Sequence, residues 1–186
     1  MVQILFMEVH HKEARHLGNM GVINQEKQMR VLSLHEVTRE NWRATLGLSV
    51  FPEQQKFIAD YVPIAAIALA KAYIRPGGLV WRPYAFYANG EMVGFTELAY
   101  EPGSLDNYWV FHFFIDCHFQ GQGYGKDGLR ILLQFIRDHH PQCQALQLTV
   151  HPENDLAQHL YSSAGFRPTG TELSGEPVYR LALTHV

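Results

Sequence analysis

Three glycines lie close together in residues 120–126, whose sequence is Gln-Gly-Gln-Gly-Tyr-Gly-Lys. An apolar run at 108–115 precedes this segment, and aliphatic residues at helical spacing follow it at 129–136. The N–H groups at the start of a helix are unpaired and the helix dipole is positive there, so a loop with few Cβ atoms can wrap a phosphate group. The order strand, glycine loop, helix therefore predicts a phosphate-binding site.

Two common phosphate-binding loops do not fit this segment. A P-loop has a glycine, four further residues and then Gly-Lys-Ser/Thr, whereas Asp127 follows Lys126 and Gln120 occupies the place of the first glycine. The glycines of residues 123–128 can be written as a dinucleotide-binding fingerprint. They begin well after the strand, however, and no acidic residue clearly ends the next strand. Both interpretations are therefore disfavoured.

A second segment, about 30 residues further on, reads Asn154-x-x-Ala157-x-x-Leu160-Tyr161-x-x-x-Gly165-Phe166. Together with Gln120-x-x-Gly123-x-Gly125 it resembles the GNAT superfamily of acyl-CoA N-acyltransferases, and the resemblance covers roughly residues 31–183. It implies an α/β fold with a central mixed sheet of seven strands, splayed at its centre and flanked by about four helices.

The resemblance also implies acetyl-CoA as the cosubstrate. Backbone groups near Ile115 and Cys117 are expected to pair with the pantetheine arm, and Asn154 is expected to lie alongside it. The pyrophosphate is expected on the backbone amides of the glycine loop, which are those of Gln120, Gly121, Gln122, Gly123, Tyr124, Gly125 and Lys126.

Direct acetyl transfer needs a deprotonated amine and an acid for the departing thiolate. Tyr161 corresponds to the tyrosine that fills the acid's role in many members of the family. Glu97 and His112 are candidate bases because each is a polar residue within an apolar strand, although a solvent-facing glutamate and a satisfied core histidine explain the same pattern. Cys117 suggests a covalent route, but a small buried residue at a strand end is the favoured interpretation.

The substrate class is indicated by residues 37–42, 51–58 and 113–116, which resemble the bacterial spermine/spermidine (diamine) acetyltransferases. That branch implies a polyamine acceptor. We expect an acidic, aromatic cleft that binds the polyamine, formed by Glu97, Glu101, Tyr84 and Trp109. A hairpin face with scattered charges is the alternative interpretation of the same residues. Other acceptors, such as an aminoglycoside, an amino acid or a protein N-terminus, and a non-catalytic CoA-binding sensor remain alternatives.

Composition limits the remaining functions. The chain has 186 residues with 47% hydrophobic and 18% charged residues, which predicts one globular domain. Its net charge is −3, so we expect no nucleic-acid partner, and the chain has no apolar run long enough for a membrane span. Cys117 and Cys143 form no CxxC pair, and the eleven histidines show no ligand spacing, so we expect a cytoplasmic protein without a metal.

The elements that must position these residues can be read along the chain. We expect an N-terminal extension at 1–30 and the acetyltransferase domain at 31–186. Within that domain the expected elements are a strand at 31–37, a helix capped by Thr38, a helix from Pro52 to Tyr73, a hairpin at 84–100 around Asn89-Gly90, strands at 108–115 and 145–150, helices after Gly125 and at 154–164, and strands at 167–173 and 178–183. An apolar edge strand near 178–183 makes a homodimer plausible.

Overall fold

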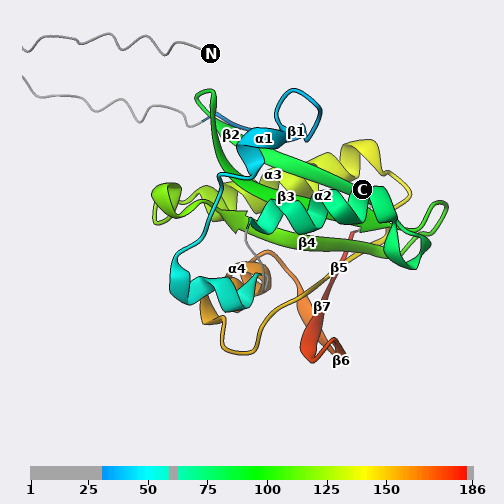
Figure 1. Cartoon of the computed structure of the whole chain (residues 1–186). Coiled ribbons are helices and arrows are strands. Elements are labelled where there is room, and N and C mark those ends of the chain that lie inside the picture. The colour runs from blue at the N-terminus through cyan, green and yellow to red at the C-terminus, as the bar shows by residue number, and fades with distance from the viewer. Residues whose placement is uncertain (1–30, 59–62, 184–186) are drawn as a thin grey trace, which may run out of the picture.

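A seven-stranded mixed sheet in the order β1-β2-β3-β4-β5-β7-β6 organises the chain (Figure 1). The computed structural model describes residues 31–58 and 63–183, and the predicted extension at 1–30 lies outside them. Only β4 and β5 pair in parallel, and the other neighbours are antiparallel. The strands are β1 (Leu32–Glu36), β2 (Val80–Ala88), β3 (Glu91–Tyr100), β4 (Tyr108–Ile115), β5 (Ala145–Thr149), β6 (Arg167–Leu173) and β7 (Glu176–Ala182). The predicted α/β architecture is confirmed.

Helices cover both faces of the sheet, with α2 and α3 on opposite sides (Figure 1). The helices are α1 (Trp42–Thr45), α2 (Ile64–Ile74), α3 (Tyr124–His139) and α4 (Asp155–Ser163), with 3₁₀ turns η1 (Pro52–Phe57), η2 (Pro76–Gly78) and η3 (Cys117–Phe119). The buried face of α3 carries the predicted residues, Leu129, Leu132, Leu133 and Ile136. Among the described helices, none combines the length and apolarity needed to cross a bilayer.

Two predictions near the N-terminus are wrong. The expected helix from Pro52 to Tyr73 is divided into the 3₁₀ turn η1 and the separate helix α2, and residues 59–62 between them lie outside the described chain. Pro63 flanks α2 in an extended conformation, with φ −69° and ψ 139°, and α2 begins after it. Thr38 is not the N-cap of a helix, because α1 begins at Trp42 and its N-cap residue is Asn41. Thr38 lies in the turn before α1, where its carbonyl oxygen accepts from the N–H of Trp42 at 3.0 Å.

The predicted edge strand at 178–183 is also wrong. β7 pairs with β5 on one side and with β6 on the other, so it lies inside the sheet. Its apolar residues are explained by this position, since Val178 and Tyr179 are buried. The true edge is β6, whose seven residues are all exposed. The apolar edge that made a homodimer plausible is therefore absent.

β4 carries a bulge at its centre. The register with β3 shifts between residues 95 and 97, where two residues of β4, His112 and Phe113, lie opposite Thr96. His112 takes up the extra residue with φ 50°, a left-handed value that is strained outside glycine. The bulge interrupts the alternation of the strand, and the His112 side chain contacts Lys71 on α2.

β4 and β5 are paired at one position and then separate. Trp109 lies opposite Gln147 near the start of β4, and no further pair joins these two strands, both of which lie wholly within the described chain. The strands β5, β7 and β6 turn away from β4, and α4 lies on the side where the strands part (Figure 1). The predicted splay is confirmed.

Asp116 fixes the chain at the end of β4, where the glycine loop begins. Its carboxylate accepts hydrogen bonds from the backbone N–H of Ser49 at 2.8 Å and of His118 at 3.0 Å. The residue is only 4% exposed, and both hydrogen bonds are partly buried, so losing the carboxylate leaves these donors without a good replacement.

We expect Asp116→Ala to lower the free energy of unfolding by about 2–3 kcal/mol, because it leaves two backbone donors without their acceptor. Urea denaturation followed by circular dichroism measures this loss. The matched control is Asp138→Ala, which removes an exposed aspartate of α3 that accepts from Gln134 Nε2 at 2.9 Å. We expect that control to change the free energy by less than about 0.5 kcal/mol. Equal losses in the two variants would contradict the role given to Asp116.

Candidate active site

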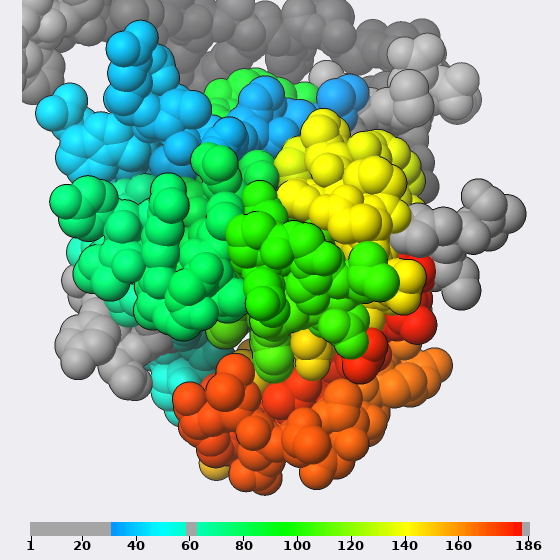
Figure 2. Space-filling view, turned by 90° about the vertical axis from the view of Figure 1, so that its right-hand side faces the viewer, coloured from blue at the N-terminus to red at the C-terminus, as the bar shows by residue number. Residues whose placement is uncertain are grey.

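Two cavities lie where β4 and β5 part. The first, of about 570 Å³, is lined by the glycine loop and is called the loop cavity. The second, of about 310 Å³, reaches the turn between β6 and β7 and is called the hairpin cavity. Figure 2 shows this orange hairpin below the green strands, with a hollow between them. The lining residues common to the two cavities are Phe57, Ile58, Phe113, Asn154, Ala157 and Tyr161. The cavities therefore meet at one junction.

The glycine loop presents the start of α3 to the loop cavity. Gly121 and Gly123 have φ values of 73° and 88°, which let the chain turn into the helix. The first N–H groups of the helix have no partner within it and can bind an anionic group. Of the seven loop residues predicted from the sequence, those on the cavity wall are Gln120, Gly121, Gly123, Tyr124, Gly125 and Lys126. Gln122 is exposed and does not line the cavity.

The side chain of Gln120 braces this loop. Its Nε2 donates to the carbonyl oxygens of Ile115 and of the Gln54 side chain, each at 2.9 Å. Gln54 Nε2 donates back to Gln120 Oε1 at 2.9 Å. The Ile115 carbonyl is thus engaged, and the N–H of Cys117 donates to the Ser49 carbonyl at 2.8 Å. Ile115 lines the loop cavity and Cys117 does not, so of the two positions expected beside the pantetheine arm only Ile115 lies on the cavity wall.

Three residues of the second motif, Asn154, Ala157 and Tyr161, reach the junction from the N-cap, the first turn and the last turn of α4. Asn154 Oδ1 accepts from the N–H of Ala157 at 3.1 Å and so caps the helix. Tyr161 is 7% exposed, and its ring packs against Phe113 and Phe166. Its hydroxyl has no hydrogen bond to another described residue. Burial raises the pKa of Tyr161 well above its ordinary value, so the hydroxyl keeps its proton and is available as a donor.

The two candidate bases lie together but face different surroundings. Glu97 Oε2 is 4.0 Å from His112 Nε2. Glu97 is fully buried and lines neither cavity, so the alternative of a solvent-facing glutamate is wrong. Burial raises the pKa of Glu97 to about 8, an effect that Lys71 partly offsets. His112 lines the hairpin cavity, and burial together with Lys71 lowers its pKa to about 4, so its imidazole is neutral at neutral pH.

Lys71 is a polar residue of this region that sequence reasoning missed. Its Nζ lies 3.1 Å from His112 Nε2. The same atom lies 4.9 Å from the ring centre of Trp81 and 5.0 Å from that of Phe111. A signal was available, because Lys71 follows the buried residue Ala68 by three positions and therefore lies near the apolar stripe of α2. A lysine near that stripe needs a partner inside the protein.

The predicted substrate cleft does not form. Tyr84 packs against Phe135 in the core beneath α3. Glu101 is exposed, and the indole N–H of Trp109 donates to Asn107 at 2.8 Å. None of these residues, nor Glu97, lines either cavity, because strand register separates side chains that are near in sequence.

The carboxylate that does line the hairpin cavity is Glu176, at the start of β7. Ser174 and Gly175, with φ values of 53° and 83°, form the tight turn that brings it there. Among the described lining residues the permanently charged groups are Glu176 and Lys56, and Lys56 forms an ion pair with Glu153. Glu176 is therefore the charge in this cavity that no described partner offsets.

Within the described residues, potential metal ligands meet at Asp116, Cys117 and His118, whose ligand atoms lie within 4.8 Å of one another. The Asp116 carboxylate accepts from two backbone N–H groups and lies 2.8 Å from His118 Nδ1. These bonds stabilise a turn, and the turn explains why the three side chains lie close together.

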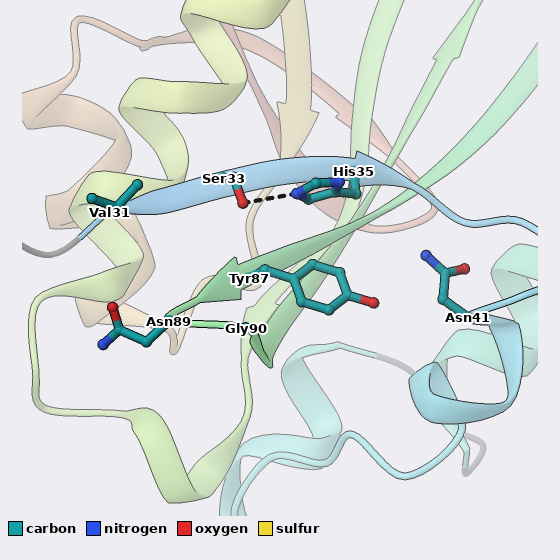
Figure 3. A pocket seen from close by; sticks show the side chains of 7 residues that line it. All are labelled: Val31, Ser33, His35, Asn41, Tyr87, Asn89 and Gly90. Atoms are coloured by element: carbon teal, nitrogen blue, oxygen red, sulfur yellow. Dashed lines mark hydrogen bonds between the residues drawn. The ribbon is translucent and has the colours of Figure 1, made fainter.

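A third cavity, of about 390 Å³, lies at the other end of the sheet between β1 and the β2–β3 turn (Figure 3). The Ser33 hydroxyl points toward His35 there, and Oγ lies 2.8 Å from Nε2. No carboxylate is among the described residues that line it, and it shares no residue with the other two cavities. It is separate from the junction.

Comparison with known proteins agrees with this geometry. Residues 34–166 match the model of the acetyltransferase (GNAT) family. The spermine/spermidine N(1)-acetyltransferase of Bacillus subtilis strain 168 is 31% identical over 153 residues, which cover 79% of this chain and 95% of that protein. The probable spermine N(1)-acetyltransferase of Bacillus subtilis subsp. natto matches with the same identity and coverage.

Solved structures share the fold at lower identity. The spermidine N-acetyltransferase of Vibrio cholerae, in complex with CoA and spermine, has a TM-score of 0.62 and is 18% identical, with 80% of this chain and 92% of that chain covered. A Salmonella typhimurium acetyltransferase that modifies the N-terminal serine of ribosomal protein L7/L12 has a TM-score of 0.63 and is 17% identical, with 82% and 95% covered.

Proposed function

This chain belongs to the acetyltransferase (GNAT) family, and from that premise we propose that it transfers an acetyl group from acetyl-CoA to a primary amine of a polyamine such as spermidine. The observation that carries the proposal is the meeting of two cavities at Tyr161, one shaped for a phosphate-bearing donor and the other carrying an unpaired carboxylate. Relatives named as spermine/spermidine acetyltransferases support the same acceptor class.

Acetyl-CoA would lie in the loop cavity with its pyrophosphate at the start of α3 and its thioester toward Tyr161. The N–H groups at the start of α3 suit its pyrophosphate, and the gap between β4 and β5 leads from there to the junction. The thioester would then lie near Tyr161, where the hairpin cavity opens. This arrangement brings donor and acceptor together, and proximity alone supplies a large part of the rate of such a transfer.

The reaction forms one bond to carbon, breaks another and moves one proton from nitrogen to sulfur. The lone pair of the neutral amine attacks the thioester carbonyl carbon, forming the C–N bond, and the C–S bond then breaks. Tyr161 donates its proton to the sulfur as negative charge develops there. The nitrogen gives one proton to water at the cavity, and the Tyr161 phenolate regains a proton from water, so no net proton is gained or lost. No nucleophilic side chain is needed, which is consistent with a Cys117 that lines neither cavity.

Of the two candidate bases, His112 is the one on the cavity wall. Its imidazole is neutral at neutral pH, but Nε2 already accepts from Lys71 Nζ and burial lowers the pKa of the ring, so it is a weak base. Glu97 is buried behind it, with Oε2 4.0 Å from the same nitrogen, and does not reach the cavity. The amine must therefore arrive with much of its proton already lost.

The hairpin cavity suits a polyamine through Glu176. A diamine or triamine has one nitrogen that reacts and others that stay protonated, and a carboxylate attracts the protonated nitrogens. Because Glu153 pairs with Lys56, the attraction of Glu176 is not cancelled by that lysine. A monoamine has no remote charge and gains nothing from this carboxylate.

The loop cavity can be tested with Gly125. We expect Gly125→Glu to weaken CoA binding by about 100-fold or more, because it sets a carboxylate where the pyrophosphate would lie. A Cβ at this position would lie 3.9 Å from its nearest contact, Leu160 Cδ2, so size alone does not disturb the fold. Gly125→Gln is the control of similar size without charge. Calorimetric titration with CoA measures the effect, and equal weakening in the two variants would argue against pyrophosphate at this site.

The acid can be tested with Tyr161→Phe. We expect kcat to fall by about 100-fold or more, because the thiolate loses its proton donor. The dissociation constant of acetyl-CoA should change by less than about twofold, since the ring and its packing remain. Release of free CoA thiol measures kcat, and titration measures binding. An unchanged kcat would remove Tyr161 from the mechanism, and loss of both would indicate a structural role.

The acceptor class can be tested with Glu176→Gln. We expect the KM for spermidine to rise about fivefold, as for the loss of a half-exposed ion pair, with kcat little changed. The KM for propylamine, which carries no second nitrogen, should stay the same. Glu172→Gln, an exposed glutamate on the same hairpin, is the matched control. A wild-type enzyme that acetylates aminoglycosides or a peptide N-terminus far faster than spermidine would contradict the proposed acceptor.

A further inference from the structure

Three ionisable side chains from three different elements meet beneath α2. Lys71 Nζ of α2 lies 3.1 Å from His112 Nε2 in the β4 bulge, and Glu97 Oε2 of β3 lies 4.0 Å from the same nitrogen. The two oxygens of Glu97 are buried without a hydrogen bond to any described residue. Such a group is costly to fold around, so its presence calls for a functional reason.

The Lys71 ammonium is held in a defined place. It lies over the rings of Trp81 and Phe111, which stabilise a cation at that position. An ammonium group has only donors, so in this contact His112 Nε2 accepts and the imidazole is neutral. Burial lowers the pKa of Lys71 and Glu97 opposes that shift.

This cation lies close behind the reaction site. Lys71 lines neither cavity, but its contact His112 lines the hairpin cavity, and the next residue, Phe113, lines both cavities. Only the imidazole of His112 therefore separates the Lys71 ammonium from the hairpin cavity. Glu176 lines the same hairpin cavity from the start of β7, so the carboxylate and the pair of Lys71 with His112 approach this cavity from different strands.

We propose that Lys71 is a positioning residue for the acceptor: its ammonium group, held behind His112, keeps the reacting amine neutral and leaves the charged nitrogens of the polyamine toward Glu176. This inference rests on the proposed function. An alkyl amine in water is almost entirely protonated at neutral pH and then has no lone pair with which to attack. A fixed cation nearby in a poorly solvated site disfavours a second positive charge and so favours the neutral amine.

Glu97 is the neighbouring group that weakens this effect when it ionises, since its Oε2 lies 4.0 Å from the nitrogen of His112 that Lys71 contacts. Burial raises the pKa of Glu97 to about 8, which favours its neutral form and so favours an effective positive charge on Lys71. Above that pH Glu97 ionises and the effect of Lys71 weakens. The remaining titratable groups that line the cavity, or pair with a group that does, are His151, Tyr161, Glu176 and the ion pair of Lys56 with Glu153.

The test is the pH dependence of the single-turnover rate at saturating acetyl-CoA and spermidine. The rate should rise with pH as the bound amine loses its proton. Since Lys71 lowers the pKa of that amine, Lys71→Met should move the midpoint of the rise upward by on the order of one pH unit. The variant should then be about tenfold slower than wild type at neutral pH and should approach it at high pH. Lys71→Arg keeps the charge and should keep the midpoint.

Two controls separate this role from a structural one. Arg43→Met removes an exposed cation that lies over the ring of Trp42, outside the cavities, and should leave the midpoint in place. Circular dichroism shows whether each variant folds, and Lys71→Gln replaces Lys71→Met if the latter does not. A rate lowered by the same factor at every pH, with the midpoint unmoved, overturns the proposal while the proposed function stands. A wild-type enzyme that acetylates no amine overturns the proposed function itself.

Discussion

The parting of β4 from β5 is the constraint on which the rest of the structure depends. Parallel neighbours end at the same edge of a sheet, so the loop after β4 and the helix after β5 meet there whatever their sequences are. Because the two strands are paired at one position, Trp109 with Gln147, the edge opens into a gap between the glycine loop and α4. The gap gives the donor a path from the start of α3 to Tyr161, and the hairpin of β6 and β7 encloses the space on the acceptor side.

The bulge in β4 brings charged and titratable side chains together beside the two cavities. A regular strand would alternate faces, whereas the extra residue lets His112 contact Lys71 on the α2 side and lets Phe113 line the junction. The cost is visible in the left-handed φ of His112 and in a buried Glu97 whose oxygens have no hydrogen bond to any residue that the structure describes. Backbone strain and unpaired polar groups collect where function requires them, and here they collect beside the junction.

Features that the sequence predicts well are those fixed by neighbours in the chain. The Asn89-Gly90 turn, the buried stripe of α3 and the position of α4 each depend on a few consecutive residues, and each forms as expected. Features that depend on pairing between distant segments were missed. The burial of Glu97, the bulge at His112 and the approach of Glu176 follow from strand register, and a shift of one residue changes the face of every side chain beyond it. The interior position of β7 likewise depends on β6, which precedes it and pairs outside it.

Recognition and reactivity make opposite demands on a polyamine. A site that attracts the molecule must favour positive charge, whereas the nitrogen that attacks must have lost its proton. One uniform acidic cleft, as expected from the sequence, would satisfy the first demand and oppose the second, because a carboxylate beside the reacting nitrogen raises its pKa. Under the proposed function, separation in space would resolve the conflict. Glu176 lines the hairpin cavity from the start of β7, and the cation of Lys71 contacts His112 on the β4 wall of the same cavity. Such a gradient of charge along one cavity would also orient the acceptor, since only the end of the molecule that can shed its proton is favoured near the thioester.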